Sequence, residues 1–525
     1  MTRDGMVARL RALQGQCDLA IIGGGATGVG IAVDAASRGY RVVLFERHDF
    51  GKGTSSRSTK LVHGGVRYLE QGNIALVREA LKERGMLRQN APHLVSNLAF
   101  VVPNYDWWEA PFYGIGLKVY DALAGKYGFG RSEILSRAET LRRLPTIRTE
   151  GLRGGVVYYD GQFDDARLLI NLVQTAADHG ATVLNYTTVA SISKGADGRV
   201  DGVVALDMES GETWQVRAAA VINAGGPFAD AVRRLAEPDA PALIAPSQGI
   251  HLVFDRSFLP GDSAIMVPHT SDGRVMFAIP WQGHTLVGTT DTPIEEPTTE
   301  PRPFDAEIDF ILETAGRYLH KAPTRADVLS VFVGIRPLVT RGHGVRTSGL
   351  SRDHTIHVDS SGLLTTAGGK WTTYRHMAED TVTKAAGLAR LPARRSRTRA
   401  LRIHGSHQDA GQFGALSPYG SDAPALQALM QGDARLAAPL HPALPYTGAE
   451  VVWAVREEMA RTIEDVLARR CRALFLNAAA AVQMVPAVAT LMAGELGWDR
   501  ARTEAETADV LAAAQGYRIE TAVMR

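Results

Sequence analysis

Residues 18–28 read DLAIIGGGATG, and this stretch decides the fold class. Its apolar first half predicts a buried parallel strand, and the glycines after it form the pattern G-x-G-x-x-G. The first glycine allows a tight turn, the second lets the backbone approach a pyrophosphate, and the third lets the following helix pack close to the strand. The start of that helix offers free N–H groups and the positive end of the helix dipole to phosphates.

The residues after this motif complete a dinucleotide-binding unit. A helix is predicted over residues 31–37 and a second buried strand over residues 42–45, and this strand ends at Glu46. Glu46 lies 18 residues beyond Gly28, where a carboxylate can accept hydrogen bonds from both ribose hydroxyls of an adenosine. Because strand, glycines, helix, strand and acid occur in this order, we expect an α/β chain with a Rossmann-like domain.

Length and composition limit the number of domains and the kinds of partner and site that are expected. A chain of 525 residues suggests two or three domains. The net charge is +1 and no basic groove interleaved with aromatics is present, so no nucleic-acid partner is expected. Cys17 and Cys471 are the only cysteines, which excludes a disulfide scaffold and CxxC motifs, and no metal site is expected. Residues 1–16 lack the apolar core of a signal peptide.

One apolar segment has the length of a membrane span. Residues 473–493 carry no charge, and about 20 apolar residues can cross a bilayer. The segment is dominated by alanine and is interrupted by Asn477, Gln483 and Pro486. We therefore favour a pair of buried helices in a soluble domain, which leaves association with a membrane surface open.

A loop rich in hydroxyl groups follows Glu46. It contains Thr54, Ser55 and Ser58, whose side chains can hydrogen-bond a pyrophosphate or a flavin. Residues 63–68, HGGVRY, then place a titratable group and a cation four residues apart around a flexible glycine pair. A surface loop is the alternative interpretation of this stretch alone.

Later segments add a mixed sheet and a second ligand-facing turn. A buried strand ends at residues 223–226, NAGG, and alternating strands over residues 245–340 predict an antiparallel sheet half exposed to a cavity. Residues 363–373 predict a last buried strand, a glycine pair and a helix that begins near Thr372. Such a helix start suits the C2 carbonyl of a flavin or its anionic reduced ring.

Several blocks together resemble the FAD-dependent glycerol-3-phosphate dehydrogenases, the respiratory, quinone-linked enzymes. They are GGGATGVG, TSSRSTKLVHGGVRYLE, VINAGGPFAD, GIRPL, GGKWTTYR and EVVWAVREEMARTIEDVLARR. The resemblance implies three parts. They are an FAD-binding domain of the glutathione-reductase or amine-oxidase type at residues 16–95, 150–245 and 340–388, an inserted mixed-sheet substrate domain at residues 96–149 and 246–339, and a C-terminal helical domain at residues 390–525.

The resemblance also implies an activity. It implies oxidation of sn-glycerol 3-phosphate to dihydroxyacetone phosphate by hydride transfer from C2 to FAD N5, with electrons passed on to a membrane quinone. A homodimer bound peripherally to the cytoplasmic, inner face of the cell membrane is expected. Two alternatives stay open. One is an oxidase that passes electrons from glycerol 3-phosphate, or from another 2-hydroxy acid or amine, to O2; the other is a non-catalytic flavin-binding protein.

The resemblance assigns roles to individual residues. His63 and His251 match the candidate positions of the catalytic base, which the sequence does not separate, and Lys370 would stabilise negative charge on the flavin. Arg336 would act in both catalysis and binding. The expected substrate-binding residues are Arg67, Tyr68, Arg274, Arg336 and Arg352. The expected cofactor contacts are Gly23, Gly25, Ala26, Thr27, Gly28, Glu46, Arg47, Thr54, Ser55, Ser58, Lys60, Gly64, Gly65, Asn223, Ala224, Gly225, Gly368, Gly369, Lys370, Trp371 and Thr372.

One position departs from the pattern of the family. The family commonly has lysine in a K-G-x-H sequence, whereas this chain has Gln248 three residues before His251. The missing positive charge would leave Arg274 or the other arginines to hold a phosphate, and a less anionic substrate would tolerate glutamine better.

Overall fold

The glycine-rich stretch joins a central strand to the first long helix of a parallel sheet. The computed structural model describes residues 1–66, 69, 73–268, 270, 274–340 and 354–519. Its first sheet has β1 (Gln16–Ile22) between β10 (Thr213–Asn223) and β2 (Val42–Phe45), with parallel pairing on both sides. The fold class expected from the sequence is confirmed. The sheet also contains β7 (Thr182–Leu184), β8 (Thr187–Lys194), β9 (Val200–Asp207), β17 (His354–Val358) and β18 (Leu364–Gly368).

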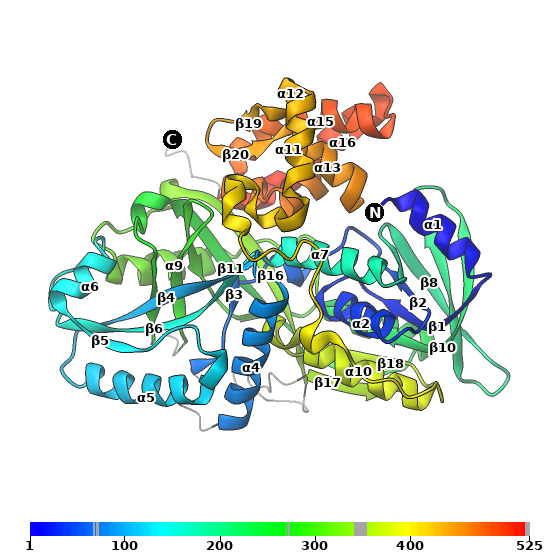
Figure 1. Cartoon of the computed structure of the whole chain (residues 1–525), viewed down its shortest axis with the longest axis horizontal. Coiled ribbons are helices and arrows are strands. Elements are labelled where there is room, and N and C mark those ends of the chain that lie inside the picture. The colour runs from blue at the N-terminus through cyan, green and yellow to red at the C-terminus, as the bar shows by residue number, and fades with distance from the viewer. Residues whose placement is uncertain (67–68, 70–72, 269, 271–273, 341–353, 520–525) are drawn as a thin grey trace.

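Helices cover this sheet where the motif begins. In Figure 1, α2 (Ala26–Ser37) packs between α7 (Asp165–Asp178) and α10 (Tyr374–Leu388). The approach of α2 to α10 is close, since a Cβ on Gly30 would lie 2.9 Å from Cδ2 of Tyr374. Two further helices, α1 (Arg3–Ala12) and α8 (Ala229–Ala236), pack beside β7 and β10 respectively.

A second, largely antiparallel sheet lies beside the first. Its strand order is β15-β11-β14-β13-β12-β4-β6-β3, and β12 with β4 is its parallel pair. The sequence pattern placed residues 154–163 with the nucleotide-binding core, but β6 pairs here with β4 in an antiparallel register. The strands are β3 (Leu61–Val62), β4 (Val95–Asn104), β5 (Glu133–Ser136), β6 (Gly154–Phe163), β11 (Ile244–Asp255), β12 (Ser263–Val267), β13 (Met276–Trp281), β14 (His284–Gly288), β15 (Thr292–Pro293) and β16 (Val328–Val339).

Helices also flank this second sheet. Figure 1 shows α4 and α5 below β4 and β6, with α6 and α9 at the outer end. Their bounds are α4 (Ile74–Asn90), α5 (Glu109–Ala124), α6 (Arg137–Arg143) and α9 (Asp305–Tyr318).

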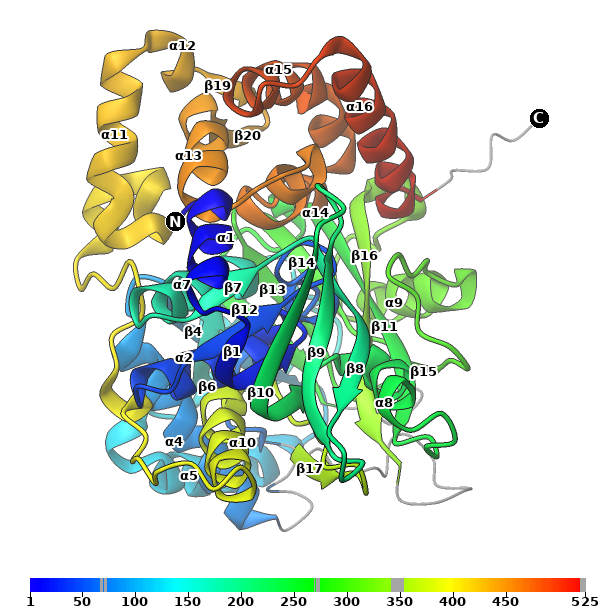
Figure 2. The same cartoon turned by 90° about the vertical axis from the view of Figure 1, so that its right-hand side faces the viewer.

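The C-terminal residues form a helical unit above both sheets, as Figures 1 and 2 show. Among the described helices, α15 alone is long and apolar enough to cross a membrane. Its residues Met484, Val488 and Met492 are buried, and it packs against α13 and α16. The elements are α11 (Ala423–Gly432), α12 (Ala434–Ala437), β19 (Pro439–His441), β20 (Leu444–Thr447), α13 (Gly448–Glu458), α14 (Ala473–Leu476), α15 (Ala478–Leu496) and α16 (Arg500–Ala514).

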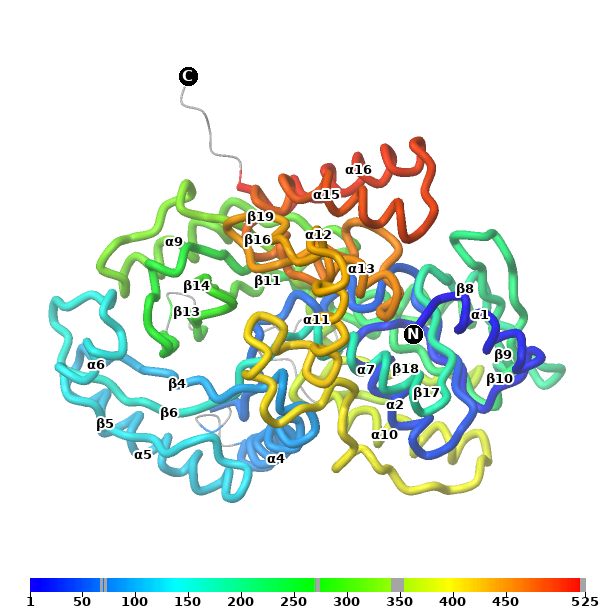
Figure 3. The backbone as a smooth tube through the Cα atoms, turned by 45° about the horizontal axis from the view of Figure 1, so that its top comes forward, coloured from blue at the N-terminus to red at the C-terminus, as the bar shows by residue number. Residues whose placement is uncertain are grey.

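Buried ion pairs tie this helical unit to the nucleotide-binding sheet. Arg469 and Arg470, on a π-helical turn, donate at 2.5 and 2.8 Å to Asp49, which follows β2. The N-terminus adds a further link, since the amino group of Met1 donates at 2.8 Å to Glu457 of α13. Figure 3 shows the N-terminus beside α13. The C-terminal unit therefore contacts the chain before β1, at Met1, and after β2, at Asp49.

Candidate functional site

A cavity of about 1100 Å³ lies between the two sheets. Its walls come from the end of β1, residues 46–66, β11, β16 and residues 368–377. This volume slightly exceeds the usual range for sites that bind small molecules. The carboxyl ends of parallel strands, where ligands bind in open α/β sheets, open into it.

The first wall is the glycine turn before α2. Gly23 has φ +110°, and a Cβ at this residue would lie 2.5 Å from the carbonyl oxygen of Ala224. A Cβ on Gly28 would lie 1.9 Å from the carbonyl oxygen of Gly23, so both positions require glycine. The helix begins at Ala26, and Gly25, Ala26 and Thr27 line the cavity. A helix N-terminus therefore faces the cavity and suits a phosphate.

Glu46 lies on the adjoining wall, at the end of β2. Its carboxylate accepts hydrogen bonds from the backbone N–H groups of Gly24 at 2.6 Å and His48 at 2.8 Å. Burial raises the pKa of Glu46. These bonds hold the carboxylate beside the glycine turn, where the ribose of a dinucleotide is expected. Arg47 is exposed and also lines the cavity.

The hydroxyl-rich loop forms the wall between the two sheets. Ser55 accepts a hydrogen bond from the N–H of Ala26 at 2.9 Å, and Thr54 donates to the carbonyl oxygen of Ile335 in β16 at 2.5 Å. Ser58 donates to Asp165 at 2.7 Å. Thr54, Ser55 and Ser58 all line the cavity.

Lys60 does not belong to this wall, which corrects its expected role. Its ammonium group is fully buried and donates to Asp165 at 2.7 Å and to the carbonyl oxygen of Ser56 at 2.8 Å. Its backbone is left-handed, with φ +64°, so the side chain turns into the protein interior. Burial lowers the pKa of Lys60 to about 7.

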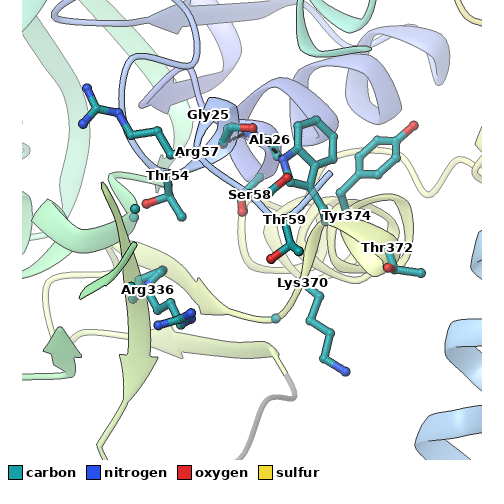
Figure 4. A pocket seen from close by; sticks show the side chains of 18 of the residues that line it. Gly25, Ala26, Thr54, Arg57, Ser58, Thr59, Arg336, Lys370, Thr372 and Tyr374 are labelled. Atoms are coloured by element: carbon teal, nitrogen blue, oxygen red, sulfur yellow. Dashed lines mark hydrogen bonds between the residues drawn. The ribbon is translucent and has the colours of Figure 1, made fainter. Parts of the chain in front are cut away.

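A second helix start also lines the cavity. Gly368 and Gly369 have φ +75° and +73°, and the residues from Gly368 to Thr372 line the cavity before α10 begins. The hydroxyl oxygen of Thr372 accepts a hydrogen bond from the N–H of His63 at 3.2 Å. Figure 4 shows Lys370 and Thr372, from the segment before α10, and Arg336, from β16, around one pocket.

Three of the expected cofactor contacts shape the cavity without lining it. Gly28 packs α2 against the glycine turn, as described above. Asn223 is buried and accepts from the N–H of Gly225 at 3.0 Å. Gly64 donates to the hydroxyl of Tyr120 at 2.9 Å. The neighbouring Gly65, Ala224 and Gly225 do line the cavity.

The second sheet contributes a histidine and two arginines. His251 is 2% exposed and stacks on Phe332 with ring centroids 4.9 Å apart. Burial and the nearby cations of Lys60 and Arg336 lower the pKa of His251 well below its usual range, so the ring is neutral. His63 also lines the cavity, and both candidate bases therefore lie at the site.

The two arginines meet at one acid. Arg336 donates to Asp291 at 3.1 Å and to the carbonyl oxygen of Thr290 at 2.9 Å. Arg274 donates to the carbonyl oxygen of Asp291 at 2.7 Å. Both arginines line the cavity, so a guanidinium group from β16 and one from the residues just before β13 reach one region of its wall. Arg67, Tyr68 and Arg352 lie outside the described residues.

Gln248 points away from the cavity. Its amide donates to Glu307 at 2.8 Å and to the carbonyl oxygen of Arg302 at 3.2 Å. Because side chains alternate along β11, Gly249 and His251 face the cavity and Gln248 faces the other side. The glutamine therefore removes no positive charge from the cavity wall, and the inference that it favours a less anionic substrate is wrong.

Sequence reasoning did not single out two acids and one hydroxyl that line the cavity. Asp160 accepts from Tyr120 at 2.8 Å and pairs with Arg84. Asp291 follows the strand β14, and Thr59 lies inside the hydroxyl-rich loop. Both acids lie close to apolar strand residues, Asp160 within β6 and Asp291 shortly after β14.

Comparisons with known proteins agree with this geometry. The model of the FAD dependent oxidoreductase family matches residues 18–375, and that of the C-terminal domain of alpha-glycerophosphate oxidase matches residues 414–503. A probable mitochondrial glycerol-3-phosphate dehydrogenase of Caenorhabditis elegans is 42% identical over 93% of this chain and 72% of its own length. The mitochondrial glycerol-3-phosphate dehydrogenase of Rattus norvegicus is 41% identical over 95% of this chain and 73% of its own.

Solved structures extend the comparison to the fold. The glycerol-3-phosphate dehydrogenase from Bacillus halodurans, complexed with FAD, has a TM-score of 0.79 and 30% identity, with 99% of both chains covered. L-alpha-Glycerophosphate oxidase from Mycoplasma pneumoniae, with FAD bound, has a TM-score of 0.55 and 18% identity over 73% of this chain and 97% of its own, which shows the fold alone. The resemblance stated from the motifs is thereby confirmed, and this chain belongs to the family of FAD-dependent glycerol-3-phosphate dehydrogenases.

Proposed function

We propose that this protein oxidises sn-glycerol 3-phosphate to dihydroxyacetone phosphate and passes the electrons to a membrane quinone. The observation that carries the proposal is one cavity lined by two helix starts and by two arginines, one on β16 and one just before β13. The helix starts suit the anionic parts of FAD, and the arginines suit a phosphorylated substrate.

The cavity walls fit FAD from end to end. Gly25 to Thr27 would hold the pyrophosphate, Glu46 the adenosine ribose, and Gly368 to Thr372 the flavin end. Glycine is required at Gly23 and Gly28 because side chains there would strike backbone atoms. When bound, FAD supplies the acceptor for the hydride that leaves C2 of the substrate.

The remaining residues would bind and activate the substrate. The phosphate would lie against Arg336 and Arg274, because guanidinium groups bind phosphate through paired hydrogen bonds. A neutral histidine would take the proton of the C2 hydroxyl, and His63 and His251 both line the cavity. Lys370 would add positive charge at the flavin end.

An apolar face on α5 supports peripheral binding to a membrane. Trp107 is 77% exposed, and Phe112, Ile115 and Val119 continue the same face of the helix at a spacing of three to five residues. Phe112 and Ile115 of this face also line the cavity, together with Tyr113. Aromatic residues suit the boundary between lipid and water. We therefore place the membrane at this face, where an apolar quinone would reach the cavity. A homodimer at the inner face of the cell membrane completes the proposal.

A comparison of electron acceptors separates this function from the alternatives. FAD-loaded protein on lipid vesicles receives glycerol 3-phosphate together with either a short-chain quinone or dissolved O2. The proposal expects quinone reduction and little hydrogen peroxide. Rapid peroxide formation without quinone reduction would establish an oxidase, and no turnover with either acceptor would favour a flavin-binding protein.

A further inference from the structure

Thr59 and His251 both line the cavity, and their side chains meet there. The hydroxyl oxygen of Thr59 is 2.9 Å from Nε2 of His251, and Thr59 itself is half-buried. Figure 4 shows its side chain among those around the pocket. The other ring nitrogen, Nδ1, is buried and has no hydrogen-bond partner among the described residues. A proton can therefore reach the ring from the cavity only through Nε2, where the threonine hydroxyl stands.

Hydrogen bonds of the residues before and after Thr59 fix this part of the loop. Its neighbours Ser58 and Lys60 both donate to the same carboxylate oxygen of Asp165, at 2.7 Å each. The left-handed backbone of Lys60 turns the chain at this point. From the C-terminal unit, Arg472 donates to the carbonyl oxygen of Ser56 at 2.7 Å. A short loop fixed by these contacts presents one hydroxyl to one nitrogen, an arrangement that suits proton transfer.

The ring itself is held in place. Phe332 stacks on one face of His251, and a Cβ on Gly288 would lie 2.3 Å from its Cδ2, so the imidazole has no room to turn. Burial, and then the positive charges of Lys60 and Arg336, lower the pKa of His251, so the ring is neutral. A phosphate dianion bound at Arg336 would offset that positive potential and make Nε2 a better proton acceptor.

We propose that Thr59 is a catalytic residue that relays the substrate's hydroxyl proton to His251. The proton of the C2 hydroxyl passes to Thr59 Oγ1 while the proton of the threonine hydroxyl passes to His251 Nε2. The O–H and C2–H bonds of the substrate break and a C=O bond forms. The electron pair of the C2–H bond leaves with the hydrogen to FAD, so this inference rests on the proposed function.

The test compares Thr59→Val, which keeps the shape and loses the hydroxyl, with Thr59→Ser, which keeps the hydroxyl. The rate of flavin reduction by glycerol 3-phosphate is measured under anaerobic conditions in mixtures of H2O and D2O. For the wild type we expect a solvent isotope effect whose dependence on the D2O fraction is curved, because two protons move together. Thr59→Val should reduce the flavin about a hundredfold more slowly, and Thr59→Ser should restore most of the rate and the curved dependence.

Two further readouts exclude a merely structural effect. The affinity for glycerol 3-phosphate and the FAD content should stay at wild-type values in Thr59→Val, so that the loss is in the rate of reduction alone. In the protein labelled with ¹⁵N-histidine, the Nε2 signal of His251, identified by its loss in His251→Gln, should shift in Thr59→Val and not in Thr490→Val. Thr490 lies on the exposed side of α15.

The outcomes distinguish this inference from the proposed function. A wild-type enzyme whose flavin is not reduced by glycerol 3-phosphate contradicts the proposed function. A wild-type enzyme that is reduced, together with a Thr59→Val variant that keeps its rate and isotope effect, overturns the relay alone. A linear dependence on D2O in the wild type also overturns it.

Discussion

Arg336 connects the proposed phosphate site to the backbone of the second sheet. It donates to Asp291, Thr289 and the carbonyl oxygen of Thr290, so its guanidinium group is positioned before any ligand binds. A group that is already ordered loses little entropy when it binds a phosphate. This residue is therefore the one most directly tied to the choice of substrate.

Arg336→Ala should slow flavin reduction by glycerol 3-phosphate about a hundredfold or more, because it removes charge-assisted hydrogen bonds to the phosphate. Anaerobic stopped-flow measurement of the flavin band checks this. Arg325→Ala is the matched control, since Arg325 is bonded to Asp305 and Asp309 on the surface. A near-normal rate in Arg336→Ala would remove that residue from the site.

Gln248→Lys should leave the Michaelis constant for glycerol 3-phosphate unchanged. The side chain at this position faces Glu307, on the side of β11 away from the cavity, so a lysine there would pair with that acid. Steady-state kinetics at fixed ionic strength measure the effect. A clear gain in affinity would show that residue 248 reaches the substrate, contrary to the structure.

Residue roles could be predicted from the sequence only where the backbone conformation follows from the motif. The glycine turn and Glu46 were found because their spacing is fixed by the strand–helix–strand unit. The direction of Lys60 was missed, because a left-handed backbone at a lysine leaves no signal in the sequence. The direction of Gln248 was available from strand alternation, since Gly249 and His251 share the cavity face.

Between elements, the contact of α2 with the end of β1 determines whether the cofactor site forms. Gly28→Ala should yield protein with little bound FAD, because the new Cβ would lie 1.9 Å from the carbonyl oxygen of Gly23 and would displace the helix. The ratio of flavin absorbance to protein absorbance in the monodisperse fraction measures this. Gly494→Ala on α15 is the control, since nothing lies within 4 Å of its Cβ. Full FAD content in Gly28→Ala would contradict the expected turn.

Local apolar patterns predict most of the helices and strands, but they do not predict which strands pair with one another. The bounds of β2 agree with those expected, because its short apolar run is unbroken. The placement of β6 failed, since its partner β4 lies far away in the chain and local sequence does not encode pairing. The sequence predicted a helical domain over residues 390–525, and the β19–β20 hairpin within it was not expected.

At the scale of the whole molecule, His404 links the C-terminal unit to α7. Its ring bonds Asp178 at 2.8 Å and Asp422 at 3.0 Å. Burial opposes its positive charge, but the two carboxylates outweigh burial and raise the pKa of His404 to about 9. Since the folded pKa exceeds the ordinary value of about 6.5, this stabilisation is complete below that pH and is lost as the pH rises through 9.

The wild type should therefore lose about 1–3 kcal/mol more stability than His404→Gln between pH 6.5 and pH 10. Thermal unfolding of the FAD-loaded proteins across this range measures the difference. His441→Gln, at a half-buried histidine on β19, is the control and should follow the wild type. Equal losses in the wild type and His404→Gln would contradict the assignment.

The orientation on a membrane is also a property of the whole molecule. Trp107→Ser with Val119→Ser should weaken binding to phospholipid vesicles at least tenfold, because two large apolar groups no longer enter the lipid. Neither residue lines the cavity, so flavin reduction should be unchanged. Met208→Ser, at an exposed site on the turn after β9, is the control in a vesicle co-sedimentation assay. Protein that stays with native membranes after an alkaline carbonate wash would contradict peripheral binding.

The most direct measurement follows the flavin absorbance of the purified protein as sn-glycerol 3-phosphate is added without oxygen. We predict that the protein is yellow, that its oxidised flavin band bleaches with this substrate, and that glycerol without the phosphate leaves the band in place. A protein that takes up no FAD, or whose bound flavin stays oxidised in the presence of glycerol 3-phosphate, would contradict the proposed site and its function.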